Sequence, residues 1–180
     1  MTFTQDDAVV VFNVVGGLAD MTLFSTVFAD GRTPAAWRKF FARIVDAKVI
    51  EENRDLVHAV AGLGYTVSYS STFPDATRMD TLGWLAAHDF PDGDLFLRPD
   101  DNLTHARRIK YQHCRAIPEY KRRLRAFVDD DIRAVNFLRN RRIPGHTFEY
   151  LLGLRVRQIR HEFDVLASKT DMCEMRPSVA

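Results

Sequence analysis

The feature that most constrains the fold is an unbroken run of β-branched residues near the N-terminus. Residues 8–15 read Ala-Val-Val-Val-Phe-Asn-Val-Val, and two glycines, Gly16 and Gly17, follow at once. A continuous apolar run is typical of a strand that is buried on both faces, as in a parallel sheet. The glycines end the strand and permit an unusual turn.

Helical and extended segments alternate along the rest of the chain. Helices are predicted at residues 34–45, 53–63, 75–88, 102–116, 132–140 and 147–167, and strands at residues 65–70, 95–97 and 124–128. Residues 21–33 are expected to be irregular, with Thr33 capping a helix that Pro34 begins. A break is expected at residues 143–145. The alternation predicts an α/β fold, with a Rossmann-like parallel sheet flanked by helices.

A length of 180 residues suits one compact domain. We expect residues 1–145 to form it, residues 146–168 to add a C-terminal helix packed on it, and residues 169–180 to be a frayed tail. No apolar run is long enough to span a membrane and no secretory leader is recognised, so a cytoplasmic protein is predicted. Cys114 and Cys173 match no zinc or redox spacing and are interpreted as unrelated reduced thiols.

Charge is distributed unevenly along the chain. Residues 1–97 carry 7 Lys/Arg and 13 Asp/Glu, whereas residues 98–180 carry 18 and 11, although the net charge is only +1. A basic half indicates either a surface for phosphates or nucleic acid, or a solvated Arg-rich helical surface. The two interpretations are left open.

Polar residues follow several of the predicted strands. They are residues 13–17, residues 70–72, Arg98 and residues 129–131. Because parallel α/β sheets bind ligands outside the carboxyl ends of their strands, these residues are the candidate site.

The end of the first strand and the glycine turn after it form a short, recognisable motif. Residues 12–20 read Phe-Asn-Val-Val-Gly-Gly-Leu-Ala-Asp. This is similar to the first motif of the haloacid dehalogenase (HAD) phosphatases, a hydrophobic strand followed by Asp-x-Asp-Gly-Thr-Leu. The Gly, the Leu and the trailing Ala-Asp match, whereas Asn13 and Val15 replace the two aspartates.

Later segments resemble the phosphatase domain of phage and bacterial polynucleotide kinases. Gly64-Tyr65 leads to Ser-Ser-Thr at residues 70–72 and then to Thr-Leu-Gly-Trp-Leu at residues 81–85. Leu-Arg at residues 97–98 and Lys110 match the next features of those domains. Asp-Asp-Asp at residues 129–131 resembles the fourth motif, Asp-Asp-Arg. The resemblance covers residues 8–145 and implies a HAD-like fold of phage or bacterial origin.

The resemblance implies a degenerate catalytic site. In the family, the first aspartate attacks phosphorus and the second exchanges protons with the leaving group and water. Neither Asn13 nor Val15 can perform these steps, so no catalytic residue is expected. Ser70, Arg98 and Lys110 would bind phosphate. Asp129 and Asp130 would hold Mg²⁺ weakly or not at all. Residues 129–131 are also expected to cap the helix that follows, a role compatible with metal binding.

Three functions are compatible with these residues. The first is a pseudophosphatase that binds a protein partner, because the chain has no room for a large cap domain and such open clefts admit macromolecules. The second is a protein that binds nucleic-acid ends or phosphates through Lys110, Arg98 and the basic helices. The third is an Mg²⁺-dependent enzyme with a non-standard site that uses Asp129, Asp130 or Asp20. The C-terminal helix, with Arg155, Arg157 and Arg160 beside an apolar stripe, could also form a homodimer.

Overall fold

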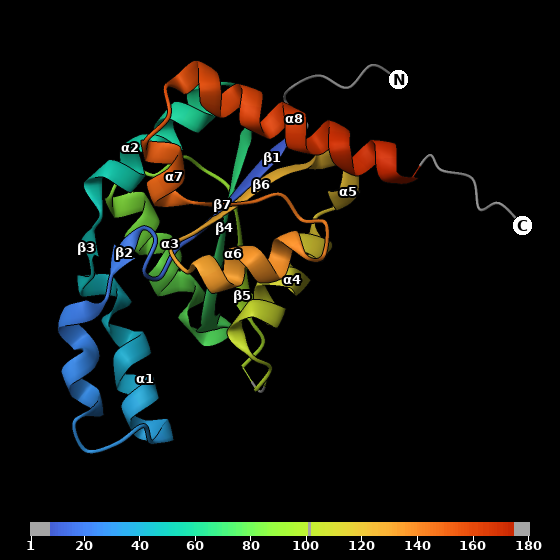
Figure 1. The fold of residues 1–180 in the computed structure, drawn as a ribbon. Coiled ribbons are helices and arrows are strands. Elements are labelled where there is room, and N and C mark those ends of the chain that lie inside the picture. The colour runs from blue at the N-terminus through green and yellow to red at the C-terminus, as the bar shows by residue number, and fades with distance from the viewer. Residues whose placement is uncertain (1–7, 101, 175–180) are drawn as a thin grey trace, which may run out of the picture.

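The computed structural model describes residues 8–100 and 102–174, with side chains as far as Val165. Five parallel strands form one sheet in the order β5–β4–β1–β6–β7 (Figure 1). The strands are β1 (Val9–Asn13), β4 (Thr66–Pro74), β5 (Asp94–Arg98), β6 (Leu124–Asp129) and β7 (Gly145–Thr147). The α/β fold with a parallel sheet is confirmed. The strand order reverses beside β1, which places a ligand-binding switch point at its carboxyl end.

Helices cover both faces of this sheet. They are α1 (Pro34–Ala42), α2 (Glu51–Gly62), α3 (Arg78–Ala87), α4 (Ala106–Ala116), α5 (Tyr120–Arg123), α6 (Ile132–Arg139), α7 (Phe148–Leu152) and α8 (Val156–Glu174). Residues of α2, α3, α7 and α8 share one apolar cluster with the sheet, whereas residues of α4 and α6 share a second.

The first strand is buried on both faces, as its sequence predicts. All five residues of β1 are buried. Val10 and Phe12 belong to the cluster under α2 and α8, whereas Val9 and Val11 belong to the cluster under α4 and α6. Because side chains alternate along a strand, Asn13 faces the α4 side together with Val9 and Val11.

A small unit is inserted between β1 and α2. It contains a two-stranded antiparallel ribbon, β2 (Ala19–Asp20) with β3 (Lys48–Val49), the 3₁₀ helices η2 (Thr22–Phe28) and η3 (Arg43–Asp46), and α1. In Figure 1, η2 and α1 extend together below the ribbon, away from the sheet. Rings of Phe28, Trp37 and Phe40 pack together there, with centroids 4.5–5.9 Å apart. No large cap is present in this described insert, as predicted.

Parts of this insert differ from the prediction. The sequence predicts an irregular segment at residues 21–33, whereas η2 forms within it, and the ribbon of β2 and β3 is not predicted. Two-residue strands carry too little sequence pattern to be recognised. Thr33 does cap α1, because its side chain accepts a hydrogen bond from the Ala36 amide.

The segments after β4 and β6 correct three further predictions. β4 continues to Pro74, although the sequence predicts a strand only as far as residue 70. The expected break at residues 143–145 leads directly into β7, where the Phe127 amide donates to the Pro144 carbonyl. The single helix expected at residues 147–167 is two helices, α7 and α8, and α7 ends at Gly153. The sheet therefore extends past the predicted boundary at residue 145.

The apolar stripe of α8 packs on the molecule's own core. Ile159 and Phe163 are buried, and the Phe163 ring contacts Tyr65 and His146 at centroid distances of 5.4 and 5.6 Å. A homodimer through this helix stays a prediction. None of the described helices is long and apolar enough to cross a membrane.

The packing of α8 predicts a large loss of stability for Phe163→Ala. The side chain is fully buried, so its removal leaves a cavity beneath the helix. We expect the free energy of unfolding, measured by urea denaturation, to fall by about 3–5 kcal/mol. Val156→Ala, at an exposed position of the same helix, should change it by less than about 0.5 kcal/mol. Equal effects of the two substitutions would contradict the packing.

Candidate functional site

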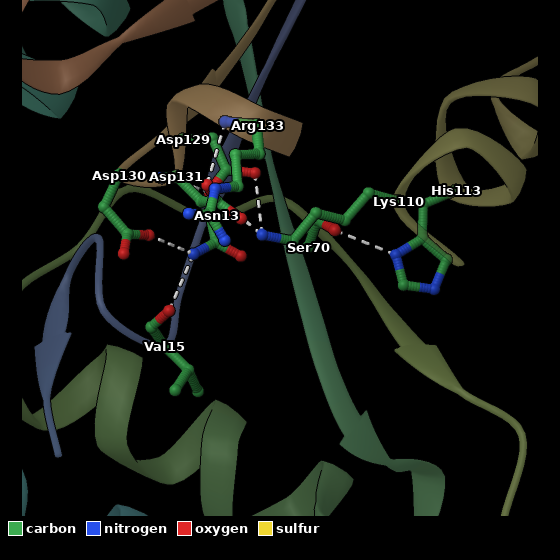
Figure 2. Close-up of polar contacts among 9 residues, drawn as sticks. All are labelled: Asn13, Val15, Ser70, Lys110, His113, Asp129, Asp130, Asp131 and Arg133. Atoms are coloured by element: carbon green, nitrogen blue, oxygen red, sulfur yellow. Dashed lines mark hydrogen bonds and ion pairs between the residues drawn. The ribbon is translucent and has the colours of Figure 1, made fainter. Parts of the chain in front are cut away.

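Asn13 lies at the carboxyl edge of the sheet and connects two of its strands (Figure 2). Its side chain is buried, and Nδ2 donates to the Val15 carbonyl at 2.7 Å and to Oδ1 of Asp130 at 2.8 Å. An amide amino group carries two protons, so both donors are used. The carboxamide therefore ties the end of β1 to the residue that follows β6.

The two glycines after β1 shape the loop that presents the Val15 carbonyl. Gly16 has a φ of +86°, and a Cβ at this position would lie 2.6 Å from Asp130 Oδ2. A Cβ on Gly17 would lie 2.3 Å from the Asn13 carbonyl oxygen. The loop is fixed from α2, because Asn53 Nδ2 donates to the Gly17 carbonyl at 2.6 Å. A side chain at either glycine would displace the Asn13 and Asp130 contacts.

Lys110 and Asp129 form a buried ion pair. Lys110, on the inner face of α4, donates from Nζ to both oxygens of Asp129, at 2.9 and 2.7 Å. Burial raises the pKa of the Asp129 carboxyl above its usual range, and Lys110 opposes that rise. Breaking one partner of such a pair costs about 3–5 kcal/mol, because the other charge is left buried and alone. Lys110 is therefore neutralised within the protein.

The Ser70 side chain contacts a buried histidine. Its Oγ lies 2.8 Å from Nδ1 of His113, and Nε2 of that ring lies 3.1 Å from the Leu97 carbonyl. A carbonyl can only accept, so Nε2 carries the proton and Nδ1 accepts from the Ser70 hydroxyl. Burial lowers the pKa of His113 to about 4, which is consistent with a neutral ring. Ser70 and His113 are both buried.

The aspartates after β6 have distinct partners. Asp129 is paired with Lys110, Asp130 accepts from Asn13, and Oδ1 of Asp131 accepts from the Arg133 amide at 2.8 Å. The last contact is the N-cap of α6, so the capping role predicted for this group of residues is confirmed at Asp131.

The geometry around Asn13 does not fit Mg²⁺. This ion needs oxygen ligands, and the HAD resemblance implies position 13, the Val15 carbonyl and a fourth-motif carboxylate. Here the amino group of Asn13 is bonded to two of these oxygens. The reversed carboxamide would instead bring three oxygens together. The described residues also contain no group of three or more His, Cys, Asp or Glu suited to a metal. Weak Mg²⁺ binding by Asp129 and Asp130 stays a prediction.

Arg98 lies apart from this cluster, in an aromatic cleft. The cleft has a volume of about 590 Å³ between α1 and the ends of β4 and β5, and Val15 reaches its wall. Arg98 donates from Nη1 to the Asn102 carbonyl at 3.2 Å, and its buried Nε has no partner among the described residues. The structure thus brings Asn13, Asp130 and the Lys110–Asp129 pair together. Arg98 is not hydrogen-bonded to any of them, and its charge lowers the pKa of His113 less than burial and the charge of Lys110 do.

Sequence reasoning misses several residues of this region. Trp37 is half-buried and lines the cleft with Phe40, Phe41 and Phe73, whereas a tryptophan at helical spacing with other apolar residues is more typical of the core. The one sequence signal for this placement is that α1 lies in the segment inserted between β1 and α2, outside the alternation of strands and helices. The contact of His113 with Ser70 is also missed, although the spacing of three residues from Lys110 places both on one helix face.

Two buried imidazoles make stability depend on pH. Burial lowers the pKa of both His113 and His146 to about 4, from the usual 6.5. Between pH 6.5 and pH 4 the unfolded chain binds protons at these rings that the folded chain does not. Unfolding free energy should therefore fall as the pH is lowered through this window, by about 3 kcal/mol or less for each ring.

Urea denaturation at several pH values in this range measures the loss of unfolding free energy. An NMR titration of the two imidazole rings shows which histidine causes it. His113 should stay neutral until the pH approaches 4. Protonation of His113 near pH 6.5 in the folded protein would contradict its contacts with Ser70 and Leu97.

Comparisons with known proteins identify the fold. No protein-family profile matches the chain, and no curated protein is similar in sequence. A chain of a Pnkp1/Rnl/Hen1 complex is 19% identical with a TM-score of 0.63, over 78% of this chain and 45% of that chain. A chain of the Pnkp1/Rnl/Hen1 RNA repair complex is 17% identical with a TM-score of 0.62, over 78% and 42%. This chain therefore spans less than half the length of either.

A third similar structure covers most of both proteins. It is the haloacid dehalogenase-like hydrolase SP0104 from Streptococcus pneumoniae, 13% identical with a TM-score of 0.57, over 79% of this chain and 84% of that chain. At such identities the likeness concerns the fold alone, here a five-stranded parallel sheet flanked by helices. The chain therefore has the fold of the HAD-like hydrolases, as the motifs along its sequence predict.

Proposed function

We propose that this protein is a pseudophosphatase, a catalytically degenerate HAD-like protein that serves as a binding module for a protein partner. The observation that carries this proposal is the pair of hydrogen bonds from the Asn13 amino group to the Val15 carbonyl and Asp130. A cation at this point would have to break both bonds. The neutral amide is also a poor nucleophile, and the Val15 side chain can transfer no proton.

The alternative functions have less support from the geometry. Phosphate binding by Lys110 would require it to leave the buried carboxylate of Asp129. A non-standard enzyme would use Asp130, which accepts from Asn13, or Asp20, which accepts from Thr22. Each of these side chains already has an internal partner.

The substitution Asn13→Asp tests the proposed closure of the site. It replaces the amino group with an oxygen, so two hydrogen bonds become repulsion with the Val15 carbonyl and Asp130. We expect a loss of about 1–3 kcal/mol without metal, and recovery of the melting temperature when Mg²⁺ binds the three oxygens. Millimolar Mg²⁺ should leave the melting temperature of the native protein unchanged. With Val15→Asp added, slow hydrolysis of p-nitrophenyl phosphate is expected.

The matched control is Asn13→Asp combined with Asp130→Asn, which removes the charge from one of the three oxygens and should abolish the effect of Mg²⁺. Stabilisation of the native protein by Mg²⁺ would contradict the proposal. So would Mg²⁺-dependent phosphatase activity of the native protein that Asp129→Ala abolishes.

The aromatic cleft supports a protein as the bound partner. Its walls include Trp37, Phe40, Phe41 and Phe73, and its charged lining residues are Arg38, Arg98 and Asp100. Aromatic residues and arginine are enriched where proteins bind each other. Leu103, which borders the cleft, is 95% exposed. An apolar side chain left this open is stabilised when a partner's apolar residues cover it.

Peptide selection against the protein tests this use of the cleft. Peptides from a phage-displayed random library should be enriched in apolar anchors, and Leu103→Asp should weaken their binding about tenfold, as for a central interface residue. Met79→Asp is the matched control, because Met79 is 77% exposed and lies outside the cleft. No enrichment, or an equal effect of the two substitutions in fluorescence anisotropy, would overturn the assignment.

A further inference from the structure

We infer that the groove between α4 and α6 binds single-stranded nucleic acid. This groove, the arginine–aromatic groove, has a volume of about 590 Å³ and is open to solvent. The residues that carry the inference are Arg107, Arg108, Tyr111, Arg115, Phe137 and Arg141. It shares no residue with the aromatic cleft, so the inference is independent of the proposed protein partner.

Helical spacing separates the groove from the Asn13 site. Arg107, Tyr111 and Arg115 are four residues apart and therefore lie along one face of α4. Lys110 and His113 are buried on the other face, toward the sheet. One helix thus holds the closed site on its inner face and presents arginines on its outer face.

Aromatic rings hold the arginine side chains in place. The Arg141 guanidinium lies 3.5 Å from the centroid of Phe137 and 5.9 Å from that of Tyr111. Arg107 lies 5.2 Å from Phe137, and Arg115 lies 5.9 Å from Tyr111. Cations and rings therefore alternate across the groove. A guanidinium positioned over a ring keeps N–H groups available for contacts to phosphates. Arg141 donates from Nη1 to the Phe137 carbonyl at 3.1 Å and retains its other N–H groups.

The groove has no internal counter-charge. Neither α4 nor residues 132–142 contain an aspartate or glutamate. Arg107, Arg108, Arg115 and Arg141 are all exposed, and none forms an ion pair with a carboxylate in the part of the chain that the structure describes. Four uncompensated charges on one surface attract a polyanion.

The rings favour nucleic acid over an acidic peptide. An acidic peptide needs only the charges, whereas bases of a single strand stack on aromatic rings and on guanidinium planes. Tyr111 and Phe137 are only half-buried, so their edges and the outer faces of the stacked guanidinium groups remain accessible. Charge and stacking surfaces together suit an unpaired strand.

Fluorescence anisotropy with labelled oligo-dT and oligo-rU tests the inference on the full chain. Arg115→Gln with Arg141→Gln should weaken binding about tenfold or more, and should reduce the slope of log K against log salt by about 0.7 for each phosphate that is no longer neutralised. The control is Arg155→Gln with Arg157→Gln, which removes the same charge from exposed positions at the start of α8 and should have little effect. Tyr111→Leu keeps the charge, removes the ring and should weaken binding severalfold.

Three results would overturn the inference. They are binding unaffected by the groove substitutions, an equal loss of affinity in the Arg155 and Arg157 control, and displacement of the oligonucleotide by poly-glutamate at equal charge concentration. The last result would assign the groove to an acidic protein. The melting temperature of each groove variant is measured as a control. If it is unchanged, a loss of binding cannot be due to a loss of fold. If the protein binds no oligonucleotide but still binds peptides in the aromatic cleft, the inference about the groove fails while the proposed function stands.

Discussion

The contacts of the Asn13 carboxamide connect the parts of the sheet edge on which the site depends. One amino group joins the end of β1 to the Val15 carbonyl and to Asp130 after β6. The glycine turn can approach Asp130 only because Gly16 has no side chain. A carboxylate at position 13 would repel the Val15 carbonyl and Asp130 unless a cation lay between them. The neutral amide of Asn13 instead donates a proton to each of these two oxygens. The oxygens of Val15 and Asp130 at this edge are therefore hydrogen-bonded to the same amino group.

The other polar side chains of the site are also paired with partners inside the protein. Lys110 and Asp129 neutralise each other, and Ser70 donates to a neutral His113 that in turn donates to Leu97. Buried polar groups stabilise a fold when they are hydrogen-bonded, and each of these side chains has a partner. Surfaces suited to binding lie elsewhere, at the aromatic cleft beside α1 and at the arginine–aromatic groove outside α4 and α6. The internal pairing of these polar groups at the sheet edge is thus compatible with a binding role for the surfaces around it.

Much of this arrangement could be predicted from the sequence, for identifiable reasons. The run at residues 8–15 is a strong signal because both of its faces are buried, and Thr33 before Pro34 marks the start of α1 correctly. Asn13, Ser70 and Asp129 could be placed near one another because they lie on parallel strands that run in the same direction. The short strands β2, β3 and β7 carry too few residues for a pattern. The pairing of Ser70 with His113 depends on tertiary contacts that no local pattern encodes.

The central claim is that the amino group of Asn13 occupies the point where a cation would otherwise be held. The most direct test follows the side-chain amide resonances of Asn13 by ¹⁵N NMR while Mg²⁺ is added to the native protein. Both protons should exchange slowly with solvent, and their shifts should not change up to millimolar Mg²⁺. A saturable shift of these resonances with loss of protection would show that the amide yields to the ion, and would contradict the account.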